Sequence, residues 1–400
     1  MKVAGHVRVP GDKSITHRAF FAAALAQGTS WVEGALTSRD ARSTAALLRR
    51  LGADVSPLRR GARVRVGGLG RLLEPPDALH CGNSGTTARL LLGILAAHPF
   101  RATVTGDTSL RRRPMRRVTV PLTEMGATFV EHNNDGLPLS VTGGPLQPLT
   151  HRQQVSSAQV KGALLFAGLA GGVSVDLIEP SGGSRDHTER LFRGLGLTVE
   201  TVRGGEWIHY RPTGGVVPFE LSIPGDISSA AFLVGAALLA EGGELSLEDV
   251  GLNPTRTGFL EVVRRMGGEG SVHTEPSRMA LEEPVGTLVA RPSPLSSTEV
   301  DAAEIPSLID EVPLLAILAS RAEGTTVFRE VGELRVKESN RLELLAANLR
   351  AIGSDAEVRG NDLYVTGGAA PPVGRIRTAG DHRLAMAFAV LGTVPAARVM

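Results

Sequence analysis

Two stretches of this sequence repeat one pattern at a distance of 214 residues. Residues 10–18 read PGDKSITHR and run directly into AFFAAALA, and residues 224–240 read PGDISSAAFLVGAALLA. In each copy Gly permits the backbone angles of a hinge and Asp is a good N-cap, which predicts a turn followed by a buried helix. The second copy lacks three side chains of the first, Lys13, His17 and Arg18. The shared residues indicate common architecture, and the unshared ones are candidates for chemistry.

A shorter repeat also runs along the chain, in which a helix-like apolar pattern ends in a glycine and an alternating strand pattern usually follows. The glycines are separated by 74, 70, 71 and 86 residues and stand at Gly52, Gly126, Gly196, Gly267 and Gly353. Each occupies the place of a helix C-cap. Three modules of about 71 residues match the offset between the two PGD copies, so we expect three modules in each half. A sixth C-cap would fall at about position 424, so we expect the last module to be incomplete.

The length of 400 residues favours two domains over one hydrophobic core. We place the crossovers at the two PGD copies. This gives a first domain of residues 12–226 and a second domain of residues 1–11 plus 227–400.

Composition excludes some classes of protein and leaves others open. Hydrophobic residues make up 42% and the net charge is +2, which is ordinary for a globular protein. The apolar runs are too short to cross a bilayer, and no signal peptide precedes the first strand pattern. The single cysteine, Cys81, cannot form an intramolecular disulfide. These features predict a cytoplasmic protein.

Lysine is rare among the basic residues. Of 43 Lys and Arg residues, four are lysines: Lys2, Lys13, Lys161 and Lys337. Arg stays charged, whereas Lys can lose a proton when its pKa falls. Lys13 and Lys337 are therefore candidates for roles that Arg cannot fill.

Several predicted helices begin with small polar residues or cations, which is typical of anion-binding helix N-termini. The segments are GDKSITHR at 11–18, HCGNSGTTARLLLGILA at 80–96, SSAQVKGALL at 156–165, SRDHTE at 184–189, ELRVKESNRL at 333–342 and GDHRLAMAF at 380–388. Each is also compatible with a plain capped helix or a tight turn. If they converge in one cleft, they would bind a ligand with several negative charges.

The segment SLRRRPMRRV at 109–118 has the highest density of charge. Pro114 fits the first position of a helix. On such a helix Arg112 and Arg113 would each face another Arg four residues later, and a bound anion would relieve that repulsion. A solvated basic face and a nucleic-acid patch are alternatives, although no aromatic residues alternate with the arginines to stack on bases.

In the second half, Asp310 stands just before Pro313 and an apolar helix pattern. A carboxylate at a helix N-terminus suits an orienting group or a general base, and a simple cap is the alternative. His187 has no second ligand at metal spacing nearby, so no metal site is predicted.

Taken in order along the chain, these segments resemble the 3-phosphoshikimate 1-carboxyvinyltransferase (EPSP synthase) family. The resemblance covers residues 8–392, and SAQVK, RDHTE and NPTR (253–256) are similar to its class II variant. It implies an α/β fold of two domains, each with three βαβαββ modules in an inside-out barrel, and an active site in the cleft between the domains. The implied partners are shikimate 3-phosphate and phosphoenolpyruvate, with no cofactor, no metal, no nucleic acid and no membrane, acting as a monomer.

The resemblance also implies roles for individual residues. Contacts to shikimate 3-phosphate would come from Lys13, Ser14, Arg18, Ser156, Ser157, Gln159, Arg185, Asp310 and Lys337. Contacts to phosphoenolpyruvate would come from Lys13, Gly85, Arg113, Gln159, Arg341 and Arg383. The implied reaction is addition followed by elimination. Asp310 would accept the proton of the attacking 5-hydroxyl, and Lys13 and Glu338 would move the proton at the methylene carbon.

Three alternatives remain open at the level of the sequence. The first is the sister enzyme that transfers the same group to UDP-N-acetylglucosamine, although its reactive Cys has no counterpart in residues 110–116. The second is a catalytically impaired homologue with a short C-terminal end. The third is a basic module that binds nucleic acid through residues 111–117. Glu333 also departs from the resemblance, because some members have Asn there.

Overall fold

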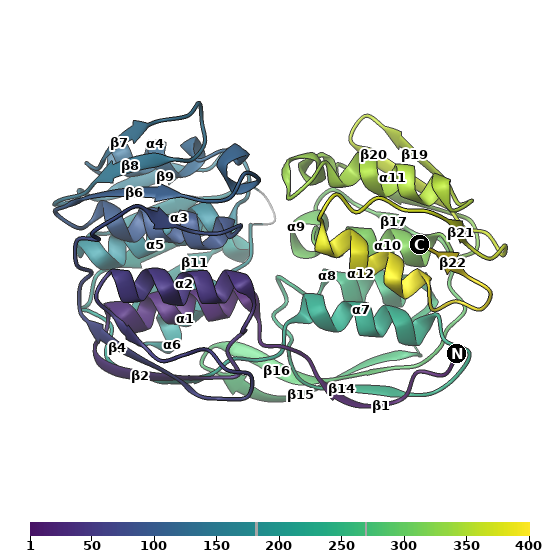
Figure 1. Cartoon of the computed structure of the whole chain (residues 1–400). Coiled ribbons are helices and arrows are strands. Elements are labelled where there is room, and N and C mark those ends of the chain that lie inside the picture. Colours follow the sequence, from purple (N-terminus) through teal and green to yellow (C-terminus); the bar gives the residue numbers. More distant parts are fainter. Residues whose placement is uncertain (181–182, 269) are drawn as a thin grey trace. The chain divides into compact units, whose positions relative to one another are not determined.

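The computed structural model describes residues 1–180, 183–268 and 270–400. The chain divides into two compact units, coloured along the sequence in Figure 1. We call residues 10–224 with 279–283 the first unit, and residues 1–9, 225–278 and 284–400 the second unit.

The first unit contains three modules. The elements of its first module are β13 (Glu220–Ser222), α1 (Lys13–Leu25), β2 (Gln27–Glu33), α2 (Arg39–Arg50), β3 (Asp54–Val55) and β4 (Val64–Leu69). Those of its second are β5 (Leu79–His80), α3 (Gly85–Ala96), β6 (Arg101–Thr105), the 3-10 turn η1 (Leu110–Arg112), α4 (Arg116–Glu124), β7 (Thr128–Glu131) and β8 (Leu139–Thr142). Those of its third are β9 (Leu149–Arg152), α5 (Ala158–Gly171), β10 (Val175–Ile178), α6 (His187–Gly194), β11 (Thr198–Val202), η2 (Arg203–Gly205) and β12 (Trp207–Arg211).

The second unit follows the same scheme. Its first module consists of β1 (Gly5–Arg8), α7 (Ile227–Leu238), β14 (Leu245–Gly251), α8 (Gly258–Val263), η3 (Arg264–Gly268), β15 (Val272–Ala280) and β16 (Glu283–Ala290). The tip of the β15–β16 hairpin, residues 279–283, belongs to the first unit. Its second consists of β17 (Glu299–Val300), α9 (Ile305–Leu308), α10 (Val312–Ala319), β18 (Thr325–Phe328), η4 (Gly332–Val336), α11 (Arg341–Ala351), β19 (Asp355–Arg359) and β20 (Asp362–Thr366). The remaining elements are β21 (Val373–Gly374), α12 (His382–Leu391) and β22 (Arg398–Val399).

Each complete module is one four-stranded mixed sheet. The strand orders are β13-β2-β4-β3, β5-β6-β8-β7, β9-β10-β12-β11, β1-β14-β16-β15 and β17-β18-β20-β19. In the register of β5, β6 and β8, the first pair is parallel and the second antiparallel, because a helix crosses over between β5 and β6. Strands β21 and β22 form a two-stranded parallel sheet. The predicted α/β fold of repeated βαβαββ modules is confirmed.

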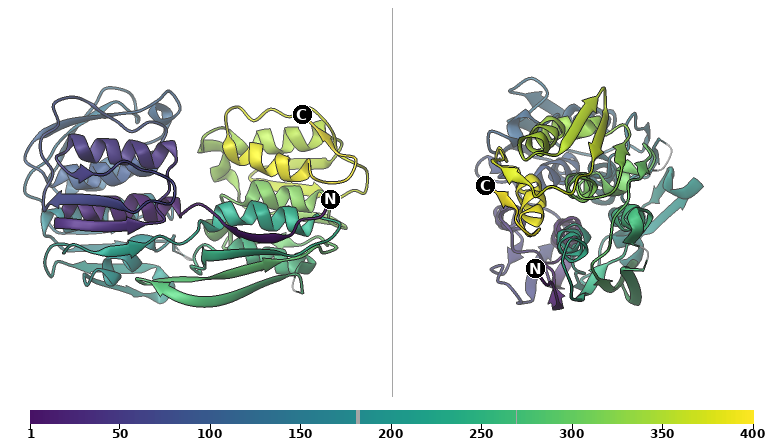
Figure 2. Two further views of the ribbon diagram at one scale, coloured as in Figure 1. Left: turned by 60° about the horizontal axis from the view of Figure 1, so that its bottom comes forward. Right: turned by 90° about the vertical axis from the view of Figure 1, so that its right-hand side faces the viewer.

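One long helix of each complete module, α1, α3, α5, α7 or α10, lies in the interior of its unit, with the sheets around it (Figures 1 and 2). All residues of α10 are buried, and α3 is buried except at one position. Helix α10 is apolar all round, as expected for a helix in a core. Small residues allow close packing: a Cβ at Gly93 of α3 would collide with the carbonyl of Ala163 in α5.

The second helix of each module ends as the repeat predicts. Gly52, Gly126, Gly196, Gly267 and Gly353 all have positive φ, between 78° and 112°. This is the left-handed region that favours glycine at a helix C-terminus. The glycine repeat therefore marks the ends of α2, α4, α6, η3 and α11.

Both PGD copies form the predicted capped turn. Asp12 accepts a hydrogen bond from the backbone N–H of Ile15 at 2.9 Å, and Asp226 accepts one from Ser229 at 3.1 Å. The two side chains are therefore the N-caps of α1 and α7. Within the described ranges, no helix combines the length and the apolar character that a membrane crossing requires.

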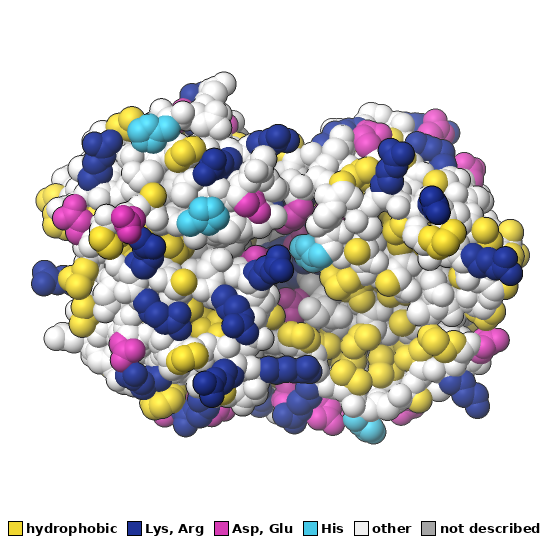
Figure 3. All heavy atoms as spheres, viewed as in Figure 1, with side chains coloured by type: hydrophobic (Ala, Val, Ile, Leu, Met, Phe, Trp, Pro, Cys, Tyr) yellow, Lys and Arg dark blue, Asp and Glu magenta, His cyan; other side chains and the backbone are white. Residues whose placement is uncertain are grey.

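The last helix differs from its counterparts because only one of its faces is covered. Helix α12 packs against α7 and α10 through Leu384, Ala387 and Phe388. Its other face is open, and Met386 is 38% exposed. Figure 3 shows hydrophobic side chains gathered on this part of the second unit.

Candidate active site

The predicted site residues form two clusters, one in each unit. In the first unit, Lys13 begins α1, and its Nζ lies 3.5 Å from Oδ2 of Asp40 on α2. Arg18 lies on the same helix and is 2% exposed. Its guanidinium donates to the Ser14 carbonyl at 3.1 Å, to the Thr188 hydroxyl at 2.7 Å and to the Ala158 carbonyl at 3.2 Å. Arg18 thereby joins the N-terminal ends of α1, α5 and α6.

Burial sets the electrostatics of Arg18. It lowers the pKa of the guanidinium to about 10, against the opposing effects of Glu189, Asp12 and Glu283. The cation of Arg185 contributes to this lowering, so the charges of Arg18 and Arg185 act on each other. Arg18 remains protonated at neutral pH, so this end of the first unit holds buried positive charge.

A second group in the first unit surrounds the start of α3. A Cβ at Gly85 would lie 3.1 Å from Nη1 of Arg113 and 3.7 Å from Oε1 of Gln159. The three predicted residues therefore lie together. Arg89 joins them, because its Nη1 donates to Oε1 of Gln159 and its Nη2 donates to the Pro114 carbonyl at 3.1 Å.

The serines before α5 and the loop before α6 meet around a buried ion cluster. Ser157 is the N-cap of α5, and its backbone N–H donates to Oε1 of Glu179 at 3.3 Å. Nζ of Lys161 lies 2.7 Å from Glu179 and 2.7 Å from Glu189, and these carboxylates raise the pKa of Lys161 against the effect of burial. Glu179 also accepts from the hydroxyl of Ser184 at 2.9 Å. Lys161 is thus structural, and it fixes the loop that carries Arg185.

The second unit brings Asp310, Arg341 and Arg383 together. The Asp310 carboxylate lies 3.8 Å from Nη1 of Arg341 and 3.7 Å from Nη2 of Arg383. Arg383 also donates to the Asp310 carbonyl at 3.1 Å. A third cation, Arg256, lies 4.0 Å from the same carboxylate. Asp310 therefore faces three guanidinium groups, and 18% of its side chain is exposed.

Further carboxylates balance these cations. Nε of Arg341 donates to Asp381 at 2.9 Å, and its Nη2 donates to Glu338 at 2.7 Å. Glu311 lies 3.4 Å from Arg383 and accepts from the hydroxyl of Ser228. Burial opposes the charge of Arg383, but the carboxylates around it outweigh burial and hold the pKa of Arg383 above its usual value. The cluster can hold and orient anionic groups while keeping its own charges paired.

The side chain of Lys337 is held by Glu333, four residues earlier in the sequence. Its Nζ donates to Oε1 of Glu333 at 3.4 Å. Glu333 is the position that departs from the resemblance, so in this chain an anionic side chain holds Lys337.

The structure corrects one expectation about the arginine-rich segment. The helix begins at Arg116 and not at Pro114, because Oδ1 of Asp135 accepts from the backbone N–H groups of Met115 and Arg116 at 2.9 and 2.7 Å. Arg112 lies in η1, before that start, so Arg112 and Arg116 do not share one helical face.

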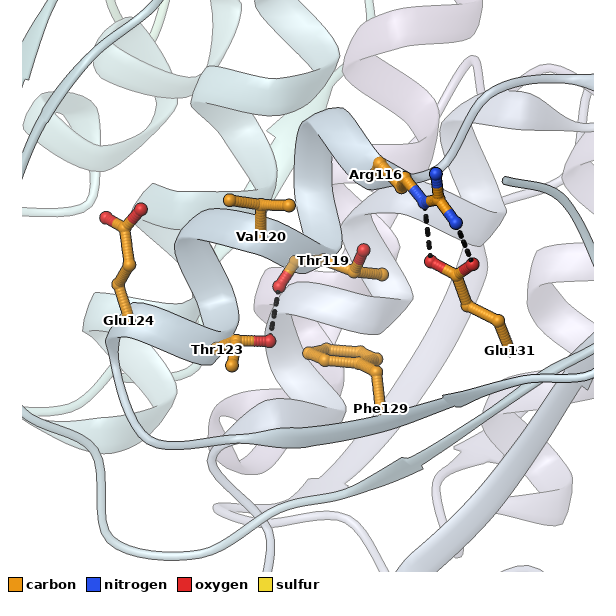
Figure 4. Close-up of a pocket in the computed structure, with 7 residues that line it drawn as sticks. All are labelled: Arg116, Thr119, Val120, Thr123, Glu124, Phe129 and Glu131. Atoms are coloured by element: carbon orange, nitrogen blue, oxygen red, sulfur yellow. Dashed lines mark hydrogen bonds and ion pairs between the residues drawn. The ribbon is translucent and has the colours of Figure 1, made fainter. Parts of the chain in front are cut away.

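Arg116 is also paired already. Its guanidinium donates to both oxygens of Glu131, at 3.1 and 2.8 Å, at one end of an open pocket of about 530 Å³ between α4 and β7 (Figure 4). Thr119, Val120 and Phe129 line its middle. No anion is needed to balance Arg116, and the pocket contains none of the predicted site residues.

The only cysteine is placed where it cannot react readily. Cys81 is fully buried, and burial raises the pKa of its thiol from 9.0 to about 12. We expect alkylation of the native protein at pH 8 to be about 10³-fold slower than alkylation of the guanidinium-unfolded chain. Mass spectrometry of both samples measures this ratio, and rapid labelling of the native chain would contradict the burial of the thiol.

No group of three or more His, Cys, Asp or Glu side chains that could hold a metal ion occurs in the part of the chain that the structure describes.

Comparison with known proteins identifies a family over the whole length of the chain. The family model for EPSP synthase (3-phosphoshikimate 1-carboxyvinyltransferase) matches residues 1–400. The chain is 44% identical over 393 residues to the 3-phosphoshikimate 1-carboxyvinyltransferase of Desulforamulus reducens, covering 98% of this chain and 90% of that protein. It is 45% identical to the enzyme of the same name from Synechococcus sp., again covering 98% and 90%.

Two solved structures also match the chain over its whole length. EPSP synthase from Acinetobacter baumannii superimposes with a TM-score of 0.85 at 37% identity, covering all of this chain and 90% of that one. The enolpyruvyl transferase NikO from Streptomyces tendae shares the fold, with a TM-score of 0.75 at 20% identity. Because the match spans both units and every complete module, the chain belongs to the EPSP synthase (3-phosphoshikimate 1-carboxyvinyltransferase) family.

Proposed function

We propose a division of roles between the two clusters in the reaction of this family, the transfer of the enolpyruvyl group of phosphoenolpyruvate to the 5-hydroxyl of shikimate 3-phosphate with release of phosphate. In the first unit, Ser14, Arg18 and Arg185 bind shikimate 3-phosphate together with Ser156 and Ser157. The buried charge of Arg18 and its links to three helix N-termini support this role. A rigid cation suits a phosphate that carries about two negative charges.

Gly85, Arg113 and Gln159 bind phosphoenolpyruvate in the same unit. Their grouping around the start of α3 is the observation that supports the proposal most directly. The helix N-terminus and the Arg113 guanidinium both favour an anion, and the missing side chain of Gly85 leaves the space for it. Arg341 and Arg383 of the second unit act on the same substrate, and Lys337 acts on shikimate 3-phosphate.

The chemical steps are assigned to Asp310, Lys13 and Glu338. Asp310 accepts the proton of the 5-hydroxyl as its oxygen attacks C2 of phosphoenolpyruvate, and Lys13 delivers a proton to C3. In the elimination, a proton leaves C3 toward Glu338 or Lys13 and the C2–O bond to phosphate breaks. Arginine clamps supply orientation and charge stabilisation, and general acid–base groups move the protons.

The test is a phosphate-release assay with the purified chain. Phosphate released only when shikimate 3-phosphate and phosphoenolpyruvate are both present supports the proposal. Thermal stabilisation by both ligands without phosphate release would identify an impaired homologue. Release with UDP-N-acetylglucosamine as acceptor would identify the sister reaction, which the comparisons do not favour.

We further propose that the chain acts as a cytoplasmic monomer and binds neither nucleic acid nor membranes. One chain carries both clusters, so a second copy is not needed to complete the set of residues, and a single buried cysteine suits a reducing compartment. Analytical ultracentrifugation of the active protein tests the monomer, because a dimer at assay concentrations would contradict it.

Replacing Gly85 by Ala tests the phosphoenolpyruvate site. The new Cβ would lie 3.1 Å from Arg113 and 3.3 Å from Arg89, so the guanidinium groups must move. We expect the KM for phosphoenolpyruvate to rise about tenfold while the KM for shikimate 3-phosphate stays unchanged. Gly144→Ala is the matched control, because a Cβ there meets nothing within 4 Å. Equal rises for both substrates would contradict the assignment.

A further inference from the structure

A chain of four buried polar side chains connects α1 to the start of α3 through α2. Nδ1 of His17 lies 2.8 Å from the hydroxyl of Thr44, and that hydroxyl lies 2.7 Å from the hydroxyl of Thr87. The Thr87 hydroxyl donates to the hydroxyl of Ser84 at 2.7 Å. His17, Thr44 and Thr87 are 0% exposed and Ser84 is 2% exposed. Burying polar groups at such depth costs free energy unless they are hydrogen-bonded. We therefore expect this hydrogen-bonded chain to have a structural or functional role.

The direction of these hydrogen bonds follows from counting protons. A hydroxyl has one proton to donate. The Thr87 hydroxyl donates its proton to Ser84, so the short contact between Thr44 and Thr87 requires Thr44 to be the donor. The Thr44 hydroxyl also lies 3.5 Å from the carbonyl of Asp40, a weaker acceptor contact. Whichever of these two acceptors takes the Thr44 proton, none is left for His17, so Nδ1 of His17 must carry the proton and donate to Thr44. The ring is therefore fixed as the Nδ1–H tautomer.

The other ring nitrogen is consistent with that assignment. Nε2 of His17 is buried and has no hydrogen-bond partner among the described residues. The reverse direction of the chain would leave an N–H group there, and a buried N–H without a partner costs more than an unused lone pair. Burial, together with the nearby cations of Lys13 and Arg18, lowers the pKa of His17 to about 3. His17 is therefore neutral, and its lone pair stands in the field of two cations.

His17 lies four residues after Lys13, so both side chains leave α1 on the same face. At the other end of the hydrogen-bonded chain, Ser84 is the N-cap of α3 and accepts a hydrogen bond from the backbone N–H of Thr87 at 3.2 Å. Gly85 follows it directly. The four side chains thus connect the turn that carries Lys13 to the turn that carries Gly85.

We infer that neutral His17 is a positioning residue: its Nδ1–H begins a hydrogen-bonded chain through Thr44 and Thr87 to Ser84, which holds the start of α1 and the start of α3 in register. This hydrogen-bonded chain sets the distance between the proton-transferring Lys13 and the phosphoenolpyruvate site at Gly85, although His17 touches neither substrate. This inference rests on the proposed function for its kinetic consequence, but not for the tautomer itself.

The tautomer is measured on the unaltered protein without any substrate. In nitrogen-15 histidine spectra, the signals of His17 are assigned as those lost in His17→Asn. We expect a proton on Nδ1, none on Nε2, and no titration between pH 5 and pH 8. A proton on Nε2, or a titration in that range, would overturn the inference whether or not the protein releases phosphate.

Two matched variants test the positioning role. The amide nitrogen of Asn and the ring Nδ1 are both bonded to Cγ, so His17→Asn keeps a donor to Thr44. In His17→Gln the amide lies one bond further out, where the other ring nitrogen stands. We expect kcat/KM for phosphoenolpyruvate to stay within about threefold in His17→Asn and to fall about tenfold or more in His17→Gln.

Thr44→Val removes the second link without changing the volume of the side chain much. We expect it to lower kcat/KM for phosphoenolpyruvate about as much as His17→Gln, and the double variant His17→Gln/Thr44→Val to lose no more than either one, because both break one chain. Equal losses in His17→Asn and His17→Gln, or fully additive losses in the double variant, would refute the positioning role. If His17→Gln does not fold, His17→Asn and Thr44→Val decide instead: a loss confined to Thr44→Val supports the positioning role, and equal values of kcat/KM in the two variants refute it.

Discussion

Replacing Lys13 by Arg is expected to lower kcat by about 10²- to 10⁴-fold while the protein stays folded. The substitution keeps the positive charge, and about a third of the Lys13 side chain is exposed, so a longer head can be accommodated. What it removes is the ability to give up a proton, because Arg stays charged in proteins. Its guanidinium can still face Asp40, so substrate binding should fall much less than turnover.

Lys337→Arg is the matched control for this experiment. Lys337 is exposed to a similar degree and lies within reach of a carboxylate, that of Glu333, as Lys13 lies near Asp40. Its proposed role is to bind shikimate 3-phosphate and not to move a proton, so Arg should raise the KM a few-fold and leave kcat nearly unchanged. Single-turnover measurement of phosphate release separates the chemical step from product release. A Lys13→Arg variant with near-normal kcat would remove Lys13 from the chemistry.

The repeats of the sequence are sufficient to predict the fold because local rules create them. A glycine with positive φ ends the second helix of each module wherever the repeat placed one, and an aspartate caps the helix after each PGD turn. These contacts lie within three or four residues, so they can be read from the sequence alone. Asp381 likewise caps α12 at the predicted helix start.

The contacts that surround the predicted site residues could not be found in this way. Arg89 lies on a helix that reads as apolar core, and its partner Gln159 is 70 residues away. Asp135, 19 residues beyond Arg116, decides where α4 begins and overrides the preference of Pro114 for a first helical position. Single-residue signals are weak against such distant partners, since tertiary packing, within a module for Asp135 and between modules for Gln159, brings them together. Arg256 and Glu311 carry no sequence signal that marks them as site residues. Their burial in the structure draws attention to them, because charged side chains are almost never fully buried unless paired.

Asp310→Asn is expected to lower kcat by about 10²- to 10⁴-fold, because the amide cannot accept the proton of the 5-hydroxyl. Asn has nearly the same shape, and the backbone carbonyl that accepts from Arg383 is unchanged, so the fold should persist. Loss of the carboxylate also leaves Arg256, Arg341 and Arg383 with one negative charge less. This extra positive charge should hold phosphoenolpyruvate at least as tightly as before, so kcat falls without a rise in KM.

Glu311→Gln separates the loss of charge from the loss of the base. Glu311 neighbours Arg256 and Arg383 as Asp310 does, but its side chain is only 1% exposed and it is held by Ser228. The variant removes one negative charge from two of the same three guanidinium groups, at a buried position that a substrate hydroxyl cannot reach. We therefore expect Glu311→Gln to lower the melting temperature by several degrees and kcat by less than about tenfold. Equal losses of kcat in the two variants would mean that the negative charge of the cluster matters and that Asp310 accepts no proton.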